Sequence, residues 1–130
     1  MAKQMKYILL VAAHNAFREA LAIRLSQEED LEVTWQAGSI ANTHNVHLDG
    51  IDVAIVDPLL PDGNGLVLIR EMSVANPSAL GLVLSSKLDP ARYHQALGAG
   101  AVEVLSTNAS MEEIINTVRS AASAESLFGK

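Results

Sequence analysis

Short apolar runs alternate with helical patterns along the whole chain, and this alternation restricts the possible folds more than any other feature of the sequence. A continuous apolar run is typical of a strand covered on both faces, whereas apolar residues three or four positions apart indicate a helix with one buried face. Parallel strands need crossover connections, which helices usually provide. The pattern therefore predicts an α/β domain in which helices cover both faces of a parallel sheet.

The alternation can be assigned to five βα units. Strands are expected at 7–11, 32–37, 51–57, 80–85 and 101–106, the second at a sheet edge because one of its faces is partly polar. Helices are expected after Asn15, briefly within 40–48, from about Asn64 to Ala75, between Asp89 and Gly100, and from Ser110 to about Ala122. Residues 58–63 are expected to form an irregular turn, because proline, aspartate and glycine dominate them.

Composition limits the class of protein. A chain of 130 residues with 49% hydrophobic and 18% charged residues suits one folded domain and not a disordered segment. The lack of cysteine excludes disulfides and thiolate zinc sites. A net charge of -6 argues against direct nucleic-acid binding. Apolar segments fall well short of the ~20 residues that span a bilayer, and the N-terminus lacks a convincing signal peptide, so we expect a cytoplasmic protein.

The residues that follow the strands are the candidates for function, since parallel sheets bind ligands beyond the carboxyl ends of their strands. Asp57 ends a buried strand, and Ser85 ends the next strand along the chain. A carboxylate in this position can act as a nucleophile, a metal ligand or a cap. Taken alone, an aspartate before a proline turn is more often a local hydrogen-bond acceptor, so both interpretations stay open.

Four segments together resemble the receiver domains of response regulators. The run DPLLPDGNGL at 57–66 resembles their phosphoacceptor loop, and LVAAHNAFREAL at 10–21 resembles the first loop of the NarL/FixJ branch. The runs VLSS at 83–86 and ALGAGA at 96–101 match two further family motifs. The resemblance implies a flavodoxin-like (βα)5 sandwich with strand order 2-1-3-4-5. It also implies a single receiver domain over 1–130, with a core at about 6–124 and a tail at 125–130.

Carried over by position, the resemblance makes Asp57 the residual phosphoacceptor and Ser85 the hydroxyl that contacts phosphate. Other functional positions depart from the family pattern. The acidic pair that helps to bind Mg²⁺ is replaced by Ala12 and Ala13. The family's lysine is replaced by Thr107, and its aromatic switch residue by Val104. All four of these altered positions are expected to line the pocket.

These departures predict the loss of ordinary phosphorylation. Phosphoryl transfer depends on neutralising anionic oxygens, and removing one positioned donor or cation costs roughly 3–4 kcal/mol of transition-state stabilisation. Mg²⁺ usually needs one or two carboxylates plus phosphate oxygens, so we expect Mg²⁺ binding to be lost or weak and no other cofactor or metal to be present. The chain is therefore interpreted as an atypical receiver domain of bacterial two-component or phosphorelay signalling, and not as an enzyme.

We expect this domain to act in signalling or transcription regulation as a protein-interaction or dimerisation module, through its fourth helix, fifth strand and fifth helix. Its partners would be a second copy, a histidine kinase or an effector domain, with no membrane contact and no direct DNA contact by this chain. Two alternatives remain: a conventional phosphoacceptor that a histidine kinase phosphorylates on Asp57, and a receiver-like domain that senses a small metabolite.

Four further residues have ordinary structural interpretations. His44 and His47 have a spacing that could hold a metal, but they are more typical of a solvated surface pair without a third ligand. His14 is expected to be a cap or surface residue, and Trp35 to be half-buried on its edge strand.

Overall fold

The structure, a computed structural model, describes residues 5–129, with side chains described for 5–120. The main sheet contains β1 (Lys6–Val11), β2 (Leu31–Ala37), β3 (Val53–Val56), β6 (Leu80–Ser85) and β7 (Ala101–Ser106). The α-helices are α1 (Asn15–Ser26), α2 (Leu66–Ala75), α3 (Pro90–Ala99) and α4 (Met111–Gly129). Two single 3-10 turns, η1 (Ala41–Thr43) and η2 (Leu48–Gly50), and two short strands, β4 (Leu59–Leu60) and β5 (Gly63–Asn64), complete the elements.

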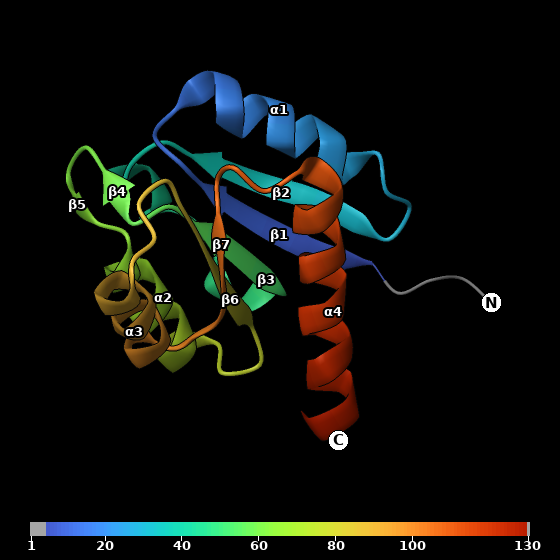
Figure 1. Cartoon of the computed structure of the whole chain (residues 1–130). Helices are drawn as coiled ribbons and strands as arrows, with labels where there is room; N and C mark the ends of the chain where they lie inside the picture. The colour runs from blue at the N-terminus through green and yellow to red at the C-terminus, as the bar shows by residue number, and fades with distance from the viewer. Residues whose placement is uncertain (1–4, 130) are drawn as a thin grey trace.

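The main sheet is fully parallel, with strand order β2-β1-β3-β6-β7. This is the predicted order 2-1-3-4-5, since β6 and β7 are the fourth and fifth strands of the main sheet. β2 lies at an edge, as its partly polar face indicated. Figure 1 shows α1 and α4 on one face of the sheet and α2 and α3 on the other. The flavodoxin-like architecture is therefore confirmed.

Alternate residues of the central strands supply two apolar layers. In β1, Ile8 and Leu10 face α1 and α4, whereas Leu9 and Val11 face α2 and α3. The first layer is completed by helix residues that are at most 5% exposed: Leu21, Ala22, Leu25, Ile114, Ile115 and Val118. The continuous apolar runs of the sequence thus arise because both faces of each central strand are covered. Ala122, predicted to extend the α4 stripe, lies outside the residues whose side chains are described.

Local capping fixes the ends of the helices. Asp89 accepts a hydrogen bond from the Arg92 N–H at 2.8 Å, which confirms it as the N-cap of α3. Gly100 ends this helix in the left-handed conformation, with φ of 112°, where a side chain would be strained. Ser110 accepts a hydrogen bond from the Glu113 N–H at 3.1 Å at the start of α4. Helix α4 continues to Gly129, through the segment expected to be a tail.

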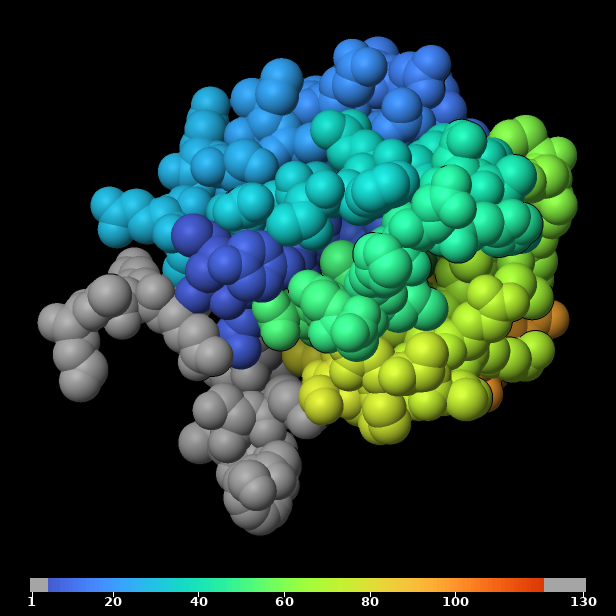
Figure 2. All heavy atoms as spheres, turned by 180° about the vertical axis from the view of Figure 1, so that it is seen from behind, coloured from blue at the N-terminus to red at the C-terminus, as the bar shows by residue number. Residues whose placement is uncertain are grey.

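The short helix predicted within 40–48 is present only as the 3-10 turn η1, and an irregular segment and η2 complete this connection. Side chains compete here for the backbone groups that a helix would use. Thr43 donates its hydroxyl to the Ile40 carbonyl at 2.6 Å, and Asn76 donates its amide to the carbonyls of Leu48 and Ile51. Figure 2 shows the segment between the cyan side chains of β2 and the yellow-green ones of α2.

The segment 58–63, predicted to be an irregular turn, instead contributes to a small antiparallel hairpin of β4 and β5. Asp62, at the tip of this hairpin, accepts hydrogen bonds from the Ile40 N–H at 2.9 Å and the Ala41 N–H at 3.0 Å. These bonds lower the pKa of the Asp62 carboxyl. The hairpin and the second connection therefore hold one another in place.

Candidate functional site

The end of β3 places Asp57 beside the end of β1. The Asp57 N–H donates to the Val11 carbonyl at 2.9 Å, so the two chain segments run together beyond the sheet. The side-chain Oδ1 accepts a hydrogen bond from the Leu59 N–H at 2.8 Å. Half-burial raises the pKa of the Asp57 carboxyl, and the bond from Leu59 partly opposes this effect. One carboxylate oxygen is thus committed to the local turn.

The two alanines after β1 occupy different environments. Ala12 is buried, at 3% exposure, and its carbonyl accepts a hydrogen bond from Arg18 Nη1 at 2.7 Å. Ala13 is exposed and lines a surface cavity. Neither side chain can offer a ligand to a cation, because a methyl group has no lone pair.

Ser85 is only 3% exposed at the end of β6. Its hydroxyl donates to the Lys87 carbonyl at 3.1 Å and accepts from the Lys87 N–H at 3.1 Å. These two bonds close a turn between β6 and α3. The next strand follows the same edge, since the Thr107 N–H donates to the Ser85 carbonyl at 3.0 Å.

Val104 is buried in the apolar layer that faces α2 and α3, at 6% exposure. Of the six residues singled out from the sequence, the structure brings Ala13 and Ser85 to the wall of one cavity. Ala12 and Val104 belong to the buried interior, and Thr107 joins the edge through its backbone. Asp57 directly precedes Pro58, the first hairpin residue on the cavity wall.

This cavity has a volume of about 660 Å³ and lies between the β4–β5 hairpin and α3. One wall comes from the hairpin and the start of α2, the other from α3, and Ser85 and Ala13 lie at the strand ends. Its remaining lining residues are Pro58, Leu59, Leu60, Pro61, Gly63, Asn64, Leu66, Arg92 and Gln95.

Three site residues were missed from the sequence. Arg92 and Gln95 were assigned only to a helix, and nothing in their spacing indicated that they face a cavity. Arg18 lies within the family-like segment 10–21, but its contact with the Ala12 carbonyl depends on the approach of α1 to the strand ends. The Arg18 Nε atom is buried without a hydrogen-bond partner in the described part of the chain. Gly38 leaves room for this guanidinium, since a Cβ there would lie 3.0 Å from Arg18 Nη1.

His14, His44, His47 and Trp35 do not line this cavity. His44 follows η1 and His47 precedes η2, so they lie on separate turns. Within residues 5–129, three or more His, Cys, Asp or Glu side chains nowhere gather in a way that could hold a metal ion. His14 is exposed at the N-cap position of α1 without a side-chain capping bond, and Trp35 is 40% exposed.

Comparisons with known proteins agree with this geometry. The family model described as the response regulator receiver domain matches residues 8–119. The chain is 31% identical over 122 residues to the DNA-binding transcriptional activator DevR/DosR of Mycobacterium tuberculosis, covering 93% of this chain and 56% of that protein. It is 32% identical over 117 residues to the transcriptional regulatory protein UhpA of Escherichia coli, covering 88% and 58%. The chain thus spans little more than half the length of these relatives.

Solved structures give the same result. The signal receiver domain of the putative response regulator NarL from Mycobacterium tuberculosis superposes with a TM-score of 0.82 at 25% identity, covering 92% of this chain and 98% of that one. The non-phosphorylated HemR receiver domain from Leptospira biflexa superposes with a TM-score of 0.82 at 25% identity, covering 91% and 94%. In the described residues, no helix is both long and apolar enough to span a membrane. The chain belongs to the response regulator receiver domain family.

Proposed function

We propose that this chain is an atypical receiver domain that works in the cytoplasm as a protein-interaction or dimerisation module, largely without Mg²⁺-dependent phosphorylation. The observation that carries the proposal is the set of side chains at the strand ends. Asp57 is the carboxylate there, and Ala12 and Ala13 stand where the family has its acidic pair.

The donor set does not fit Mg²⁺. This ion demands near-octahedral oxygen coordination and gives up its waters reluctantly. One oxygen of Asp57 already accepts the Leu59 N–H, and the Ala12 carbonyl already accepts from Arg18. The charge that would neutralise an incoming phosphoryl group is also reduced, because Thr107 replaces the family's lysine.

The path from phosphorylation to output is altered as well. Val104 is packed in the interior and has no ring that could swing between two positions. The Ser85 hydroxyl would have to break its two bonds to Lys87 before it could turn toward a phosphoryl group. Together these features favour a domain whose resting conformation is its working one.

A candidate contact surface lies on α3 and β7. Three large apolar residues there are 39–50% exposed, Tyr93, Leu97 and Val102, as is Leu88 in the turn before α3. Apolar groups gathered on one surface favour association with a protein partner. The partner would be a second copy, a histidine kinase or an effector domain of a transcription regulator. DevR/DosR and UhpA, which are transcription regulators by name, extend well beyond the part that this chain matches.

Intact-mass measurement with acetyl phosphate and Mg²⁺ tests the central claim. We expect no +80 Da species in the wild type and its appearance in the triple variant Ala12→Asp, Ala13→Asp, Thr107→Lys, which restores the family's residues. A +80 Da species in the wild type that disappears in Asp57→Asn would instead establish the conventional phosphoacceptor.

The contact surface is tested separately by size-exclusion chromatography with light scattering. We expect Leu97→Asp to reduce self-association or binding to an effector domain. Val74→Asp is the matched control, because Val74 is 83% exposed on α2 and is not one of the residues of this surface. Equal effects of the two variants would contradict the assignment of the surface.

A further inference from the structure

We propose that the cavity between the β4–β5 hairpin and α3 binds a small amphipathic anion, with a flat apolar body and one carboxylate or sulfonate group. The site goes beyond the proposed interaction function and does not depend on it. Its volume of about 660 Å³ lies within the range of roughly 300–1,000 Å³ that is typical of small-molecule sites.

The hairpin wall suits an apolar body. Pro58, Leu59, Leu60 and Pro61 follow one another along it. Leu59 is 47% exposed, so apolar surface meets water when the cavity is empty of ligand. A planar ring laid against this wall would remove that surface from water, which is favourable in proportion to the area covered.

The α3 wall supplies hydrogen-bond donors. Arg92 and Gln95 are three residues apart, so they lie on one face of the helix. Arg92 Nη1 pairs with Asp89 Oδ2 at 3.0 Å, which leaves most of the five guanidinium N–H groups free for a second acceptor. The side-chain amide of Gln95 makes no hydrogen bond within the described residues. Guanidinium groups bind the paired oxygens of carboxylates especially well.

Ala13 makes the cavity more favourable for an anion. An aspartate at this position, as in the family, would direct a negative charge at the same space. Its replacement by a methyl group removes that repulsion and adds apolar surface. Asp57 precedes the hairpin wall, so the anionic head is placed on the opposite wall beside Gln95 and Arg92, whose guanidinium also pairs with Asp89.

Buried Ser85 connects the ligand site to the turn before α3. Ser85 lines the cavity and closes the turn before α3 through Lys87. A ligand held between the hairpin and α3 would contact Ser85 before this turn and Arg92 after it. It would therefore fix the turn in one arrangement. Binding would then bias the position of α3, which carries Tyr93 and Leu97 of the candidate contact surface.

Two fluorescent probes of nearly the same shape test the proposal. 1-Anilinonaphthalene-8-sulfonate carries the anion, and N-phenyl-1-naphthylamine lacks it. We expect saturable binding of the sulfonate at one site per chain, about tenfold tighter than the neutral probe, as one charge-assisted contact would give. Arg92→Gln should weaken sulfonate binding about tenfold and leave the neutral probe unchanged. Ala13→Asp should act in the same direction.

Arg70→Gln on α2 is the matched control and should change neither probe, since Arg70 does not line the cavity. Leu59→Trp, which fills the cavity, should weaken both probes. Circular dichroism and Tm would verify that each variant is folded. Sulfonate binding that is unsaturable, or that survives both Arg92→Gln and Leu59→Trp in folded protein, would overturn the proposal. These outcomes require neither phosphorylation nor self-association, so failure here leaves the proposed interaction function standing.

Discussion

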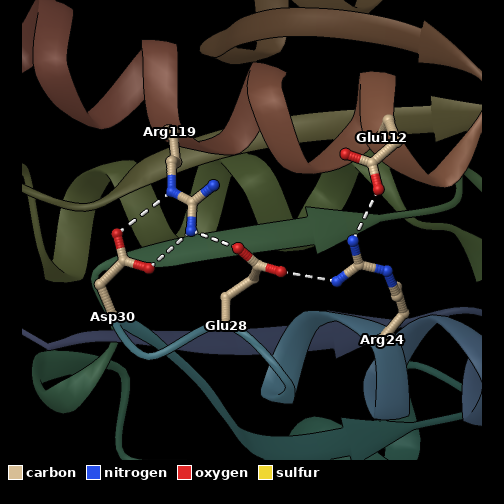
Figure 3. Close-up of polar contacts among 5 residues, drawn as sticks. All are labelled: Arg24, Glu28, Asp30, Glu112 and Arg119. Atoms are coloured by element: carbon tan, nitrogen blue, oxygen red, sulfur yellow. Dashed lines mark hydrogen bonds and ion pairs between the residues drawn. The ribbon is translucent and has the colours of Figure 1, made fainter.

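The two faces of the sheet are built differently. The face under α1 and α4 is sealed by an apolar layer and by an ion-pair network that joins both helices (Figure 3). The opposite face, under α2 and α3, is completed by the hairpin and by η1 and η2 instead of a further helix. The cavity of about 660 Å³ borders α2 and α3, and a second of about 160 Å³ lies beneath the irregular segment.

The network extends across the first face. Arg119 of α4 binds Glu28 at 2.5 Å and Asp30 at 2.8 Å, while Arg24 of α1 binds Glu28 and Glu112, each at 2.6 Å. These contacts lower the pKa of the Glu28 carboxyl, chiefly through its hydrogen bond to Arg24. The face under α1 and α4 is therefore held by an apolar layer and ion pairs, whereas the other face borders two cavities.

Core truncations should show the largest difference in unfolding free energy between the two faces. Leu25→Ala, at 0% exposure under α1, should cost about 3–5 kcal/mol of unfolding free energy, because the packed surroundings cannot collapse into the space. Leu68→Ala should cost only about 2 kcal/mol, since Leu68 already borders the cavity of about 160 Å³. Urea unfolding measures both, and equal costs would contradict the idea of a more loosely packed second face.

Substitution of Gly65 tests how closely the chain after the hairpin packs against Asp57. A Cβ there would overlap the Asp57 carbonyl oxygen and lie 2.9 Å from Val56 Cγ1, so the chain would have to shift. We expect Gly65→Ala to cost about 2 kcal/mol of unfolding free energy. Gly50→Ala is the control, with nothing within 4 Å of the added Cβ, and should stay within about 0.5 kcal/mol of wild type. A neutral Gly65→Ala would mean that the loop after Asp57 adapts freely.

The same contrast explains what could be predicted from the sequence. The strands at 80–85 and 101–106 and the caps Asp89 and Ser110 were located correctly, because burial on both faces and helix capping leave local patterns. The segment 40–48 was predicted only in part, because its conformation depends on distant partners. Asp62 binds the backbone of Ile40 and Ala41, and Asn76 binds Leu48 and Ile51.

The candidate site divides in the same way. Asp57 and Ser85 could be located at strand ends, because parallel strands bring their carboxyl ends to one edge. The roles of Arg18, Arg92 and Gln95 could not, since each depends on how a helix approaches the loops. Arg18 reaches the Ala12 carbonyl, and the other two face the hairpin across the cavity.

Removing the Arg119 guanidinium should destabilise the face under α1 and α4. Arg119→Gln should lower Tm by roughly 2–5 °C, since the side chain is partly exposed and such pairs are individually weak. Salt at 0.5 M should shrink the difference. Because the folded-state pKa of Glu28 is depressed, the stabilisation it contributes is present above its ordinary pKa and is lost as pH falls through the lower one. Arg70→Gln serves as control, and a loss that is insensitive to both salt and acid would contradict an electrostatic role.

Asp57→Asn should give the smallest effect, and one of opposite sign. Burial raises the folded-state pKa of Asp57 above its ordinary value near 3.8, so ionisation costs stability as pH rises past that value. Asparagine keeps an oxygen for the Leu59 N–H but carries no charge, so the variant should be slightly more stable than wild type at pH 7 and equal to it below pH 3.8. The difference in Tm between the two proteins, followed from pH 7 into acid, measures this. A variant less stable at pH 7 would contradict this prediction, because it would mean that interactions of the ionised carboxylate, such as the hydrogen bond from the Leu59 N–H, outweigh the cost of its burial.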